Sequence, residues 1–248
     1  MAIDLDRVME EEREWLFAEA LLLDGHFPLA AVAEVADIRA PSLSRVPAGS
    51  LAPLSAATAQ HALVQTIPGI AWQGRPYCFL WTHVAAGKHG TRKYRDYYIE
   101  YLERCRGQSG TLPSDHEVDH LYSEDRAAKL GLVWIRMALL PEGLNASHGA
   151  AIEKSRGKAV DSGADGSAVY FGTAGRPRHI DWITLMKLFL VRSPRKRQPL
   201  AGRADVQAFA LEMGAKLGVE PAEVLRGIEE LRRVAAELDA RNRRLAGA

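Results

Sequence analysis

The residues whose types and spacing suggest chemistry lie in two short segments, residues 117–121 and 144–154. The first segment places Asp119 directly before His120, and the second contains Asn145. Cutting a phosphodiester requires a base that takes a proton from water and a hard cation that neutralises charge on the phosphate. Histidine suits the first task because it titrates near neutrality, and Asp and Asn oxygens suit Mg²⁺. Together the two segments predict a one-metal site for phosphodiester cleavage.

The elements that must position these residues are two strands and a helix. If residues 117–121 form a strand, alternation sends His120 to one face and Asp119 to the other. Both can then serve one site only if the strand ends or bends there, and a polar turn signal follows directly. Residues 132–140 are almost continuously apolar and predict the second strand, and a helix is expected to start at Asn145.

From Asp119 to Lys154 the sequence resembles the HNH (ββα-metal, or His-Me finger) endonuclease family, in which two strands and a helix hold one divalent cation. The resemblance covers residues 112–158 and rests on Asp-His in the first strand, the apolar second strand and Asn-Ala-Ser-His-Gly at the helix start. That last motif is similar to bacterial toxin nucleases of the superfamily. The resemblance implies that His120 is the general base and that Asp119 and Asn145 bind Mg²⁺ or Mn²⁺.

Two features depart from the family's pattern. Arg136 stands where the family's register puts an asparagine that braces the histidine loop, and the zinc-binding cysteine pairs of many members are absent. Arg136 and His148, which follows Asn145 by one helical turn, are candidates to offset charge on the phosphate during cleavage, as is Lys154.

The net charge of +1 does not by itself indicate nucleic-acid binding, which usually leaves a basic footprint. A surface for the nucleic-acid backbone must therefore be local. We expect it to include the basic run before the candidate site and the basic end of the following helix, through Lys88, Arg92, Lys93, Arg95 and Lys154. A solvated loop is the alternative interpretation of the basic run.

Each candidate also has an ordinary structural interpretation. His120 can equally be a capping or partly buried histidine. Asn145 can be a helix N-cap, and His148 can be an ordinary surface histidine. On that interpretation the protein is a non-catalytic protein-interaction or nucleic-acid-binding module with a degenerate HNH core. Arg136 is the best argument for it.

Length and composition predict a soluble globule. The predicted elements make it α+β, and the HNH resemblance implies a small ββα-metal core embedded in a mostly helical frame. The chain has 248 residues, of which 47% are hydrophobic and 25% charged. The expected regions are an N-terminal helical segment and linker (1–60), a nuclease-like domain with a preceding β-hairpin and helix (61–195), and a C-terminal helical hairpin (196–248).

Hydrophobic periodicity and turn signals predict the remaining elements. They are an amphipathic helix over residues 4–23 with a solvated acidic run at Glu10–Glu12, a short helix over 29–36, a loop over 41–57, an aromatic β-hairpin over 70–81, a helix after Thr91 with a core-facing tyrosine stripe, a helix beginning at Asp181, and two helices over 204–245 that break near Gly218.

Targeting and partners follow from the same reasoning. The sequence has no run of about 18 apolar residues and no basic, apolar leader, so we expect no membrane span and a cytoplasmic location, with export by a specialised secretion system left open. Family resemblance favours DNA over RNA as substrate, and implies an immunity protein if the nuclease is a toxin rather than a defence enzyme. A homodimer through the C-terminal helices is a further expectation. Cys78 and Cys105 lack metal-type spacing and are predicted to be free thiols.

Overall fold

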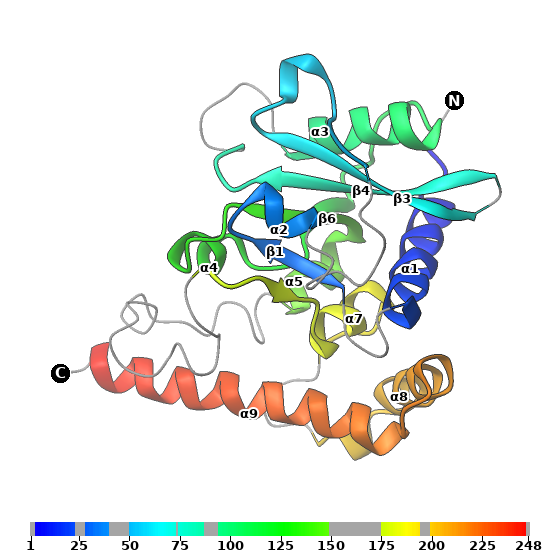
Figure 1. Ribbon diagram of the computed structural model, residues 1–248. Coiled ribbons are helices and arrows are strands. Elements are labelled where there is room, and N and C mark those ends of the chain that lie inside the picture. The colour runs from blue at the N-terminus through cyan, green and yellow to red at the C-terminus, as the bar shows by residue number, and fades with distance from the viewer. Residues whose placement is uncertain are drawn as a thin grey trace.

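Strand β6 (Trp134–Pro141) lies at the centre of the fold. The computed structural model describes residues 3–22, 28–39, 50–72, 74–86, 94–148, 175–193 and 199–246. Within these residues the strands form a seven-stranded sheet in the order β2-β3-β4-β6-β1-β7, with β5 also paired to β6 (Figure 1). Each of these strand pairs is antiparallel. The protein is therefore of mixed α+β class, as predicted.

Helices and strands alternate along the described chain. Their bounds are α1 (Leu5–Leu22), β1 (Leu29–Val32), α2 (Val35–Arg39), β2 (Ser50–Pro53), η1 (Ala56–Thr58), β3 (Ala62–Trp72), β4 (Arg75–His83), α3 (Tyr94–Tyr101), the π-helical turn η2 (Leu102–Arg106), β5 (His116–His120), α4 (Glu124–Lys129), β6, α5 (Glu142–His148), β7 (Arg178–His179), α7 (Trp182–Leu188), η5 (Leu200–Gly202), α8 (Ala204–Leu217) and α9 (Pro221–Ala246).

The N-terminal region contributes two strands to the sheet. β1 lies between β6 and β7 with all four residues buried, and β2 pairs with β3. The helix expected over residues 29–36 is wrong in its first half, because a short apolar run that is covered on both faces is more stable as an interior strand. The loop expected over residues 41–57 likewise contains β2. Segments from residues 1–60 and 61–195 thus share one sheet.

β6 separates two hydrophobic cores. Met137 and Leu139 face the core built with α1, α3, β3 and β4, whereas Ala138 and Leu140 face the core built with α5, α7, α8 and α9. Figure 1 shows α3 on one side of the sheet and α7, α8 and α9 on the other. Since successive side chains of a strand point to opposite faces, burial on both sides requires the continuous apolar run seen in the sequence.

Several elements match the sequence expectations. The aromatic hairpin is β3–β4, and the tyrosine stripe of α3 is buried at Tyr97, Tyr98 and Tyr101. Asp181 caps α7 by accepting a hydrogen bond from the Thr184 N–H at 2.7 Å. The C-terminal hairpin is α8–α9, which break at Gly218 with φ of 68°. Cys78 and Cys105 are free thiols.

The acidic residues of α1 differ from the prediction. Glu11 and Glu12 are only 7% and 6% exposed, not solvated. Glu11 forms an ion pair of 2.6 Å with Arg106, whose guanidinium lies 3.6 Å from the centre of the Trp15 ring. A buried charge is tolerated when it is paired and hydrogen-bonded, so the prediction failed because the partner on η2 is remote in sequence.

Glu12 is held by the neighbouring elements of the same core. The Tyr98 hydroxyl donates to one of its carboxylate oxygens, and the Leu139 N–H donates to the other at 3.1 Å. Burial raises the pKa of the Glu12 carboxyl, while Arg106 opposes that rise. The contacts join α1 to α3 and β6.

We predict that Arg106→Met lowers the free energy of unfolding by about 3–5 kcal/mol, because it removes the buried guanidinium that pairs with Glu11 and offsets the burial of Glu12. Arg104→Met is the matched control on the same turn. Arg104 is exposed and pairs with Glu100 at 2.8 Å within the helix, so its loss is expected to cost less than about 1 kcal/mol. Urea unfolding of both variants checks this, and equal losses would contradict the assigned role of Arg106.

A second prediction concerns pH. Because the folded-state pKa of Glu12 is raised, the stability it contributes is present at low pH and is lost as pH rises through the folded-state pKa. Glu12→Gln keeps groups that can bond Tyr98 and Leu139, so it should lose less unfolding free energy than wild type as pH rises above the ordinary glutamate pKa of 4.5. Glu10→Gln, an exposed change on the same helix, should follow wild type. Parallel curves for wild type and Glu12→Gln would refute the prediction.

Candidate functional site

The candidate residues lie on a strand–strand–helix unit. β5 pairs with β6 so that Asp119 lies opposite Ala138 and His120 opposite Met137. α5 follows β6 without a loop and packs against both strands. The two strands and the helix follow one another in the predicted order, but helix α4 lies between the strands where a loop was expected.

Asp119 and Asn145 are brought together, and Glu117 joins them. The side-chain amide of Asn145 donates to Glu117 Oε2 at 2.8 Å and to Asp119 Oδ1 at 3.3 Å. Asn145 acts from inside α5, which begins at Glu142, so its expected place at the helix start is wrong. The helix starts earlier because β6 leads into it directly. We call Glu117, Asp119 and Asn145, with the lysine described next, the β5–α5 cluster.

Lys187 completes the cluster and was missed by the sequence analysis. Its side chain is 3% exposed, and its ammonium forms an ion pair with Asp119 Oδ2. It belongs to α7, whose other inward residues, including Met186 and Leu188, are apolar and buried. A single lysine within the apolar run of residues 180–191 is the only signal in the sequence that could have indicated it, and such a signal is weak.

His120 lies on the opposite side of β5. The strand neither ends nor bends before this residue, so the alternation places its imidazole away from the face that carries Asp119. The ring packs edge-to-face on Tyr94 of α3, with ring centres 4.3 Å apart and planes at 86°. The structure therefore joins Asp119 to Asn145 but places His120 beside α3.

Arg136 and His148 are buried among protein groups. The Arg136 guanidinium lies 3.3 Å from the centre of the Phe79 ring and is 1% exposed. His148 is fully buried, with Nε2 2.8 Å from the carbonyl oxygen of Val191, so it is not a surface histidine. These contacts hold β6 against β4, and α5 against the segment after α7.

Arg95 is the one expected nucleic-acid contact that lies in the described part of the chain. Its guanidinium donates to the carbonyl oxygens of His116 at 2.8 Å and Pro113 at 2.6 Å, and also to that of Leu112. Arg95 therefore ties α3 to the segment that leads into β5. The others, Lys88, Arg92, Lys93 and Lys154, lie outside the described residues.

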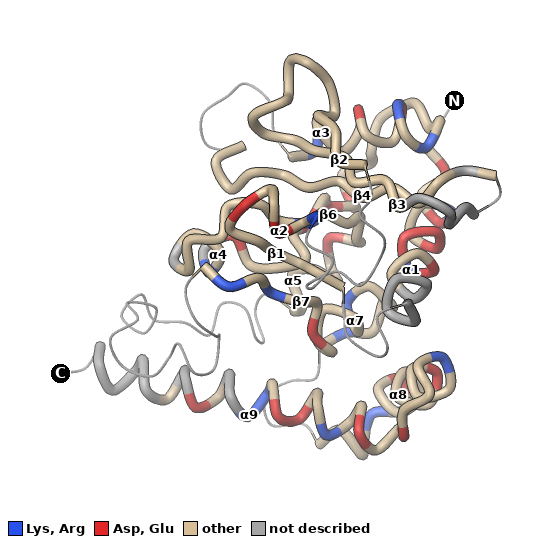
Figure 2. Tube along the Cα trace, in the orientation of Figure 1, with Lys and Arg blue, Asp and Glu red and all other residues tan. Residues whose placement is uncertain are grey.

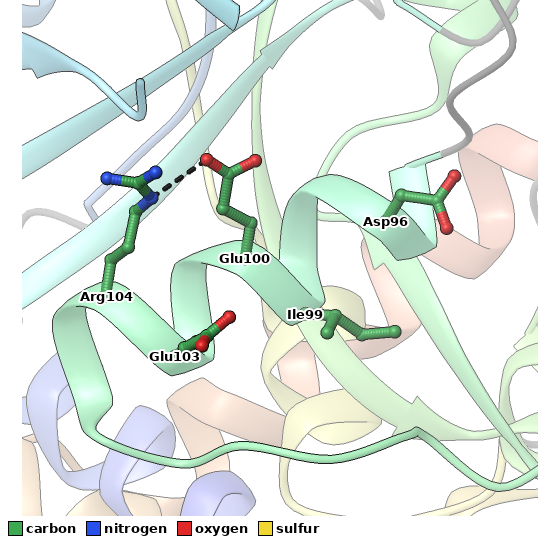
Figure 3. A pocket seen from close by; sticks show the side chains of 5 residues that line it. All are labelled: Asp96, Ile99, Glu100, Glu103 and Arg104. Carbon is green, nitrogen blue, oxygen red and sulfur yellow. Dashed lines mark hydrogen bonds and ion pairs between the residues drawn. The ribbon is translucent and has the colours of Figure 1, made fainter. Parts of the chain in front are cut away.

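A hollow of about 610 Å³ lies along α3 and η2, away from the β5–α5 cluster. Its lining residues are Asp96, Ile99, Glu100, Glu103 and Arg104. Figure 3 shows that they project from this one helical segment, with Glu100 bonded to Arg104. With three carboxylates and one guanidinium, the lining has a net negative charge that repels a polyanion. We therefore do not assign this hollow to nucleic acid.

The chemistry of the β5–α5 cluster fits a hard divalent cation. Two carboxylates and an amide oxygen are donors of the kind that Mg²⁺ and Mn²⁺ take, and Mg²⁺ keeps several waters, so few protein ligands suffice. The Asn145 amide presents its oxygen after rotation by half a turn. In the described residues no group of three or more His, Cys, Asp or Glu side chains is placed to hold a metal, so this mixed set is the candidate.

Comparison of the chain with protein-family models, with curated proteins and with solved structures gave no significant match. Among the described helices, none combines the length and apolar character that a membrane crossing needs.

We predict that Asn145→Ala destabilises the protein by about 1.5–3 kcal/mol, because the lost amide donates to two carboxylates that then face each other without it. Ser147→Ala on the same helix is the control, since Ser147 only bonds the Leu144 carbonyl of its own turn at 2.8 Å. Its effect should stay within about 0.5 kcal/mol. Thermal and urea unfolding measure both, and indistinguishable variants would argue against a stabilising amide bridge.

Proposed function

We propose that the protein is a metal-dependent endonuclease that hydrolyses phosphodiester bonds of nucleic acid, with DNA favoured over RNA. The observation that supports this is the convergence of Glu117, Asp119 and Asn145 on one strand–strand–helix unit. The HNH resemblance of residues 112–158 supports the same reaction. A toxin effector or a defence nuclease both suit this chemistry.

Asp119 and Asn145 are the proposed ligands of Mg²⁺ or Mn²⁺, and Glu117 is a further oxygen donor on the same face. The bound cation would supply charge neutralisation at the phosphate and the leaving oxygen. Packing of α5 against β5 and β6 fixes the separation of these donors before a ligand arrives.

His120 is the proposed general base. Its ring is held edge-on by Tyr94, whose hydroxyl donates to the Val84 carbonyl at 3.3 Å. Asp119 and His120 are the last two residues of β5 and both are partly buried. A phosphodiester that uses both must therefore lie at the end of β5, where it meets side chains from the two faces.

The proposed nucleic-acid contacts are Lys88, Arg92, Lys93 and Lys154, which flank the unit in sequence. Arg95 supports them by fixing the end of that basic run to the segment before β5. Arg233 pairs with Glu230 within α9, and Figure 2 shows charges of both signs interspersed along that helix. We therefore propose α8–α9 for packing or homodimer formation, and an immunity protein as partner if the enzyme is a toxin.

The test is cleavage of plasmid DNA and of RNA with Mg²⁺, with Mn²⁺ and with chelator. We expect metal-dependent cutting that falls by at least about 100-fold in His120→Ala, because a general base contributes about that much or more, and that is abolished in Asp119→Asn. Asp115→Asn and His179→Ala, both at exposed positions, should cut like wild type.

Equal cutting by wild type and the site variants would remove these residues from the reaction. A non-catalytic nucleic-acid-binding or protein-interaction module is the second candidate. It is favoured by the position of His120 on the other face of β5 from Asp119, and by the stacking of Arg136 on Phe79. Retarded migration of DNA without cleavage under every metal condition would select that candidate.

A further inference from the structure

Lys187 carries a buried positive charge to the β5–α5 cluster. Its ammonium pairs with Asp119 Oδ2, and the Asn145 amide donates to Asp119 Oδ1 at 3.3 Å. Each oxygen of this carboxylate therefore already has a donor. The Asp119 side chain keeps 15% exposure, against 3% for Lys187, so the carboxylate is more accessible to solvent than the ammonium that pairs with it.

The fold fixes the position of this ammonium. α7 is capped by Asp181 and packs against α5, β6 and α9. Its contact with α9 is close, because a Cβ at Gly227 would lie 2.4 Å from Trp182 Cδ1. A lysine at a position that the core would accept as apolar costs free energy of desolvation, and its pairing with Asp119 offsets that cost. The ion pair with Asp119 therefore gives this buried charge a role that an apolar side chain at the same position would lack.

The charge balance of the cluster suggests what the lysine does. Among the described residues of the cluster, Glu117 and Asp119 are the acidic side chains, and Lys187 offsets the charge of one of them. A divalent cation would turn the small negative excess into a positive one, which attracts a phosphate. The ammonium and the cation both need Asp119, and two positive charges this close repel each other.

We propose that Lys187 is the internal counter-ion of the β5–α5 cluster: it occupies the place on Asp119 that a divalent cation takes, and is released to a phosphate oxygen when the cation binds. The phosphate step rests on the proposed function. The competition for Asp119 does not, because it concerns cation binding alone.

The test measures Mn²⁺ affinity of the full chain by electron paramagnetic resonance and by calorimetry, without nucleic acid. Lys187→Met should bind Mn²⁺ at least about tenfold more tightly than wild type, because the competing charge is gone. Lys187→Met with Asp119→Asn should lose that binding. Lys216→Met, which removes a half-exposed lysine paired with Glu212 at 3.0 Å, should match wild type.

Affinity for Mn²⁺ that is unchanged or weaker in Lys187→Met overturns the proposal, as does the absence of saturable binding in both proteins. Circular dichroism checks folding, and Lys187→Gln provides the same comparison if the methionine variant does not fold. If the Lys187–Asp119 pair only stabilises the fold, these variants are less stable than wild type and show no gain in Mn²⁺ affinity.

Activity measured at saturating Mn²⁺ separates this inference from the proposed function. We expect kcat of Lys187→Met to fall about 10–100-fold while its Mn²⁺ requirement is met at lower concentration, and Lys187→Arg to restore part of kcat. If Lys187→Met binds Mn²⁺ more tightly but wild type cuts no nucleic acid, the nuclease proposal is refuted, whereas competition between Lys187 and the cation for Asp119 is supported. If wild type cuts nucleic acid but Lys187→Met binds Mn²⁺ no more tightly, the nuclease proposal stands and the competition for Asp119 is refuted.

Discussion

Burial of β6 on both faces is the constraint on which the rest of the structure depends. A strand with apolar side chains on both sides needs a covering layer on each, and antiparallel neighbours must satisfy its backbone. α1 and α3 supply one layer, and α5, α7, α8 and α9 the other. The end of β6 that pairs with β5 then leads directly into α5, which sets the helix over the strand that carries Asp119.

The period of two in β5 decides the geometry of the candidate site. It groups Glu117 with Asp119 toward α5 and α7, and it sends Val118 and His120 toward the core that contains α3. A mechanism that uses Asp119 and His120 together must therefore work around the end of the strand. The same alternation explains why Lys187, from the α7 side, meets Asp119, whereas Tyr94 meets the imidazole.

Local patterns allowed part of this to be predicted from the sequence. The tyrosine stripe of α3, the Asp181 cap and the break at Gly218 depend on neighbours within one or two turns, and all three are present. Features that depend on remote partners were missed. Glu12 is buried because Tyr98 and the backbone of β6 donate hydrogen bonds to its carboxylate. The periodicity within α1 does not predict these contacts. β1 is a strand because its neighbours cover both faces. Lys187 could not be recognised as a site residue without its ion pair with Asp119, which is remote in sequence.

Two buried charge groups in the molecule differ in balance. In the group that Arg7 and Glu11 of α1 form with Arg106 of η2, Glu11 accepts from Arg7 at 2.8 Å and from Arg106 at 2.6 Å, so its two oxygens meet two guanidinium groups. In the β5–α5 cluster, the described partners of two carboxylates are one ammonium and a neutral amide. A balanced group gains nothing from another cation, whereas a carboxylate excess in a partly desolvated site attracts one. The group on α1 and η2 therefore stabilises the fold, whereas the β5–α5 cluster keeps the uneven charge on which the proposed metal site depends.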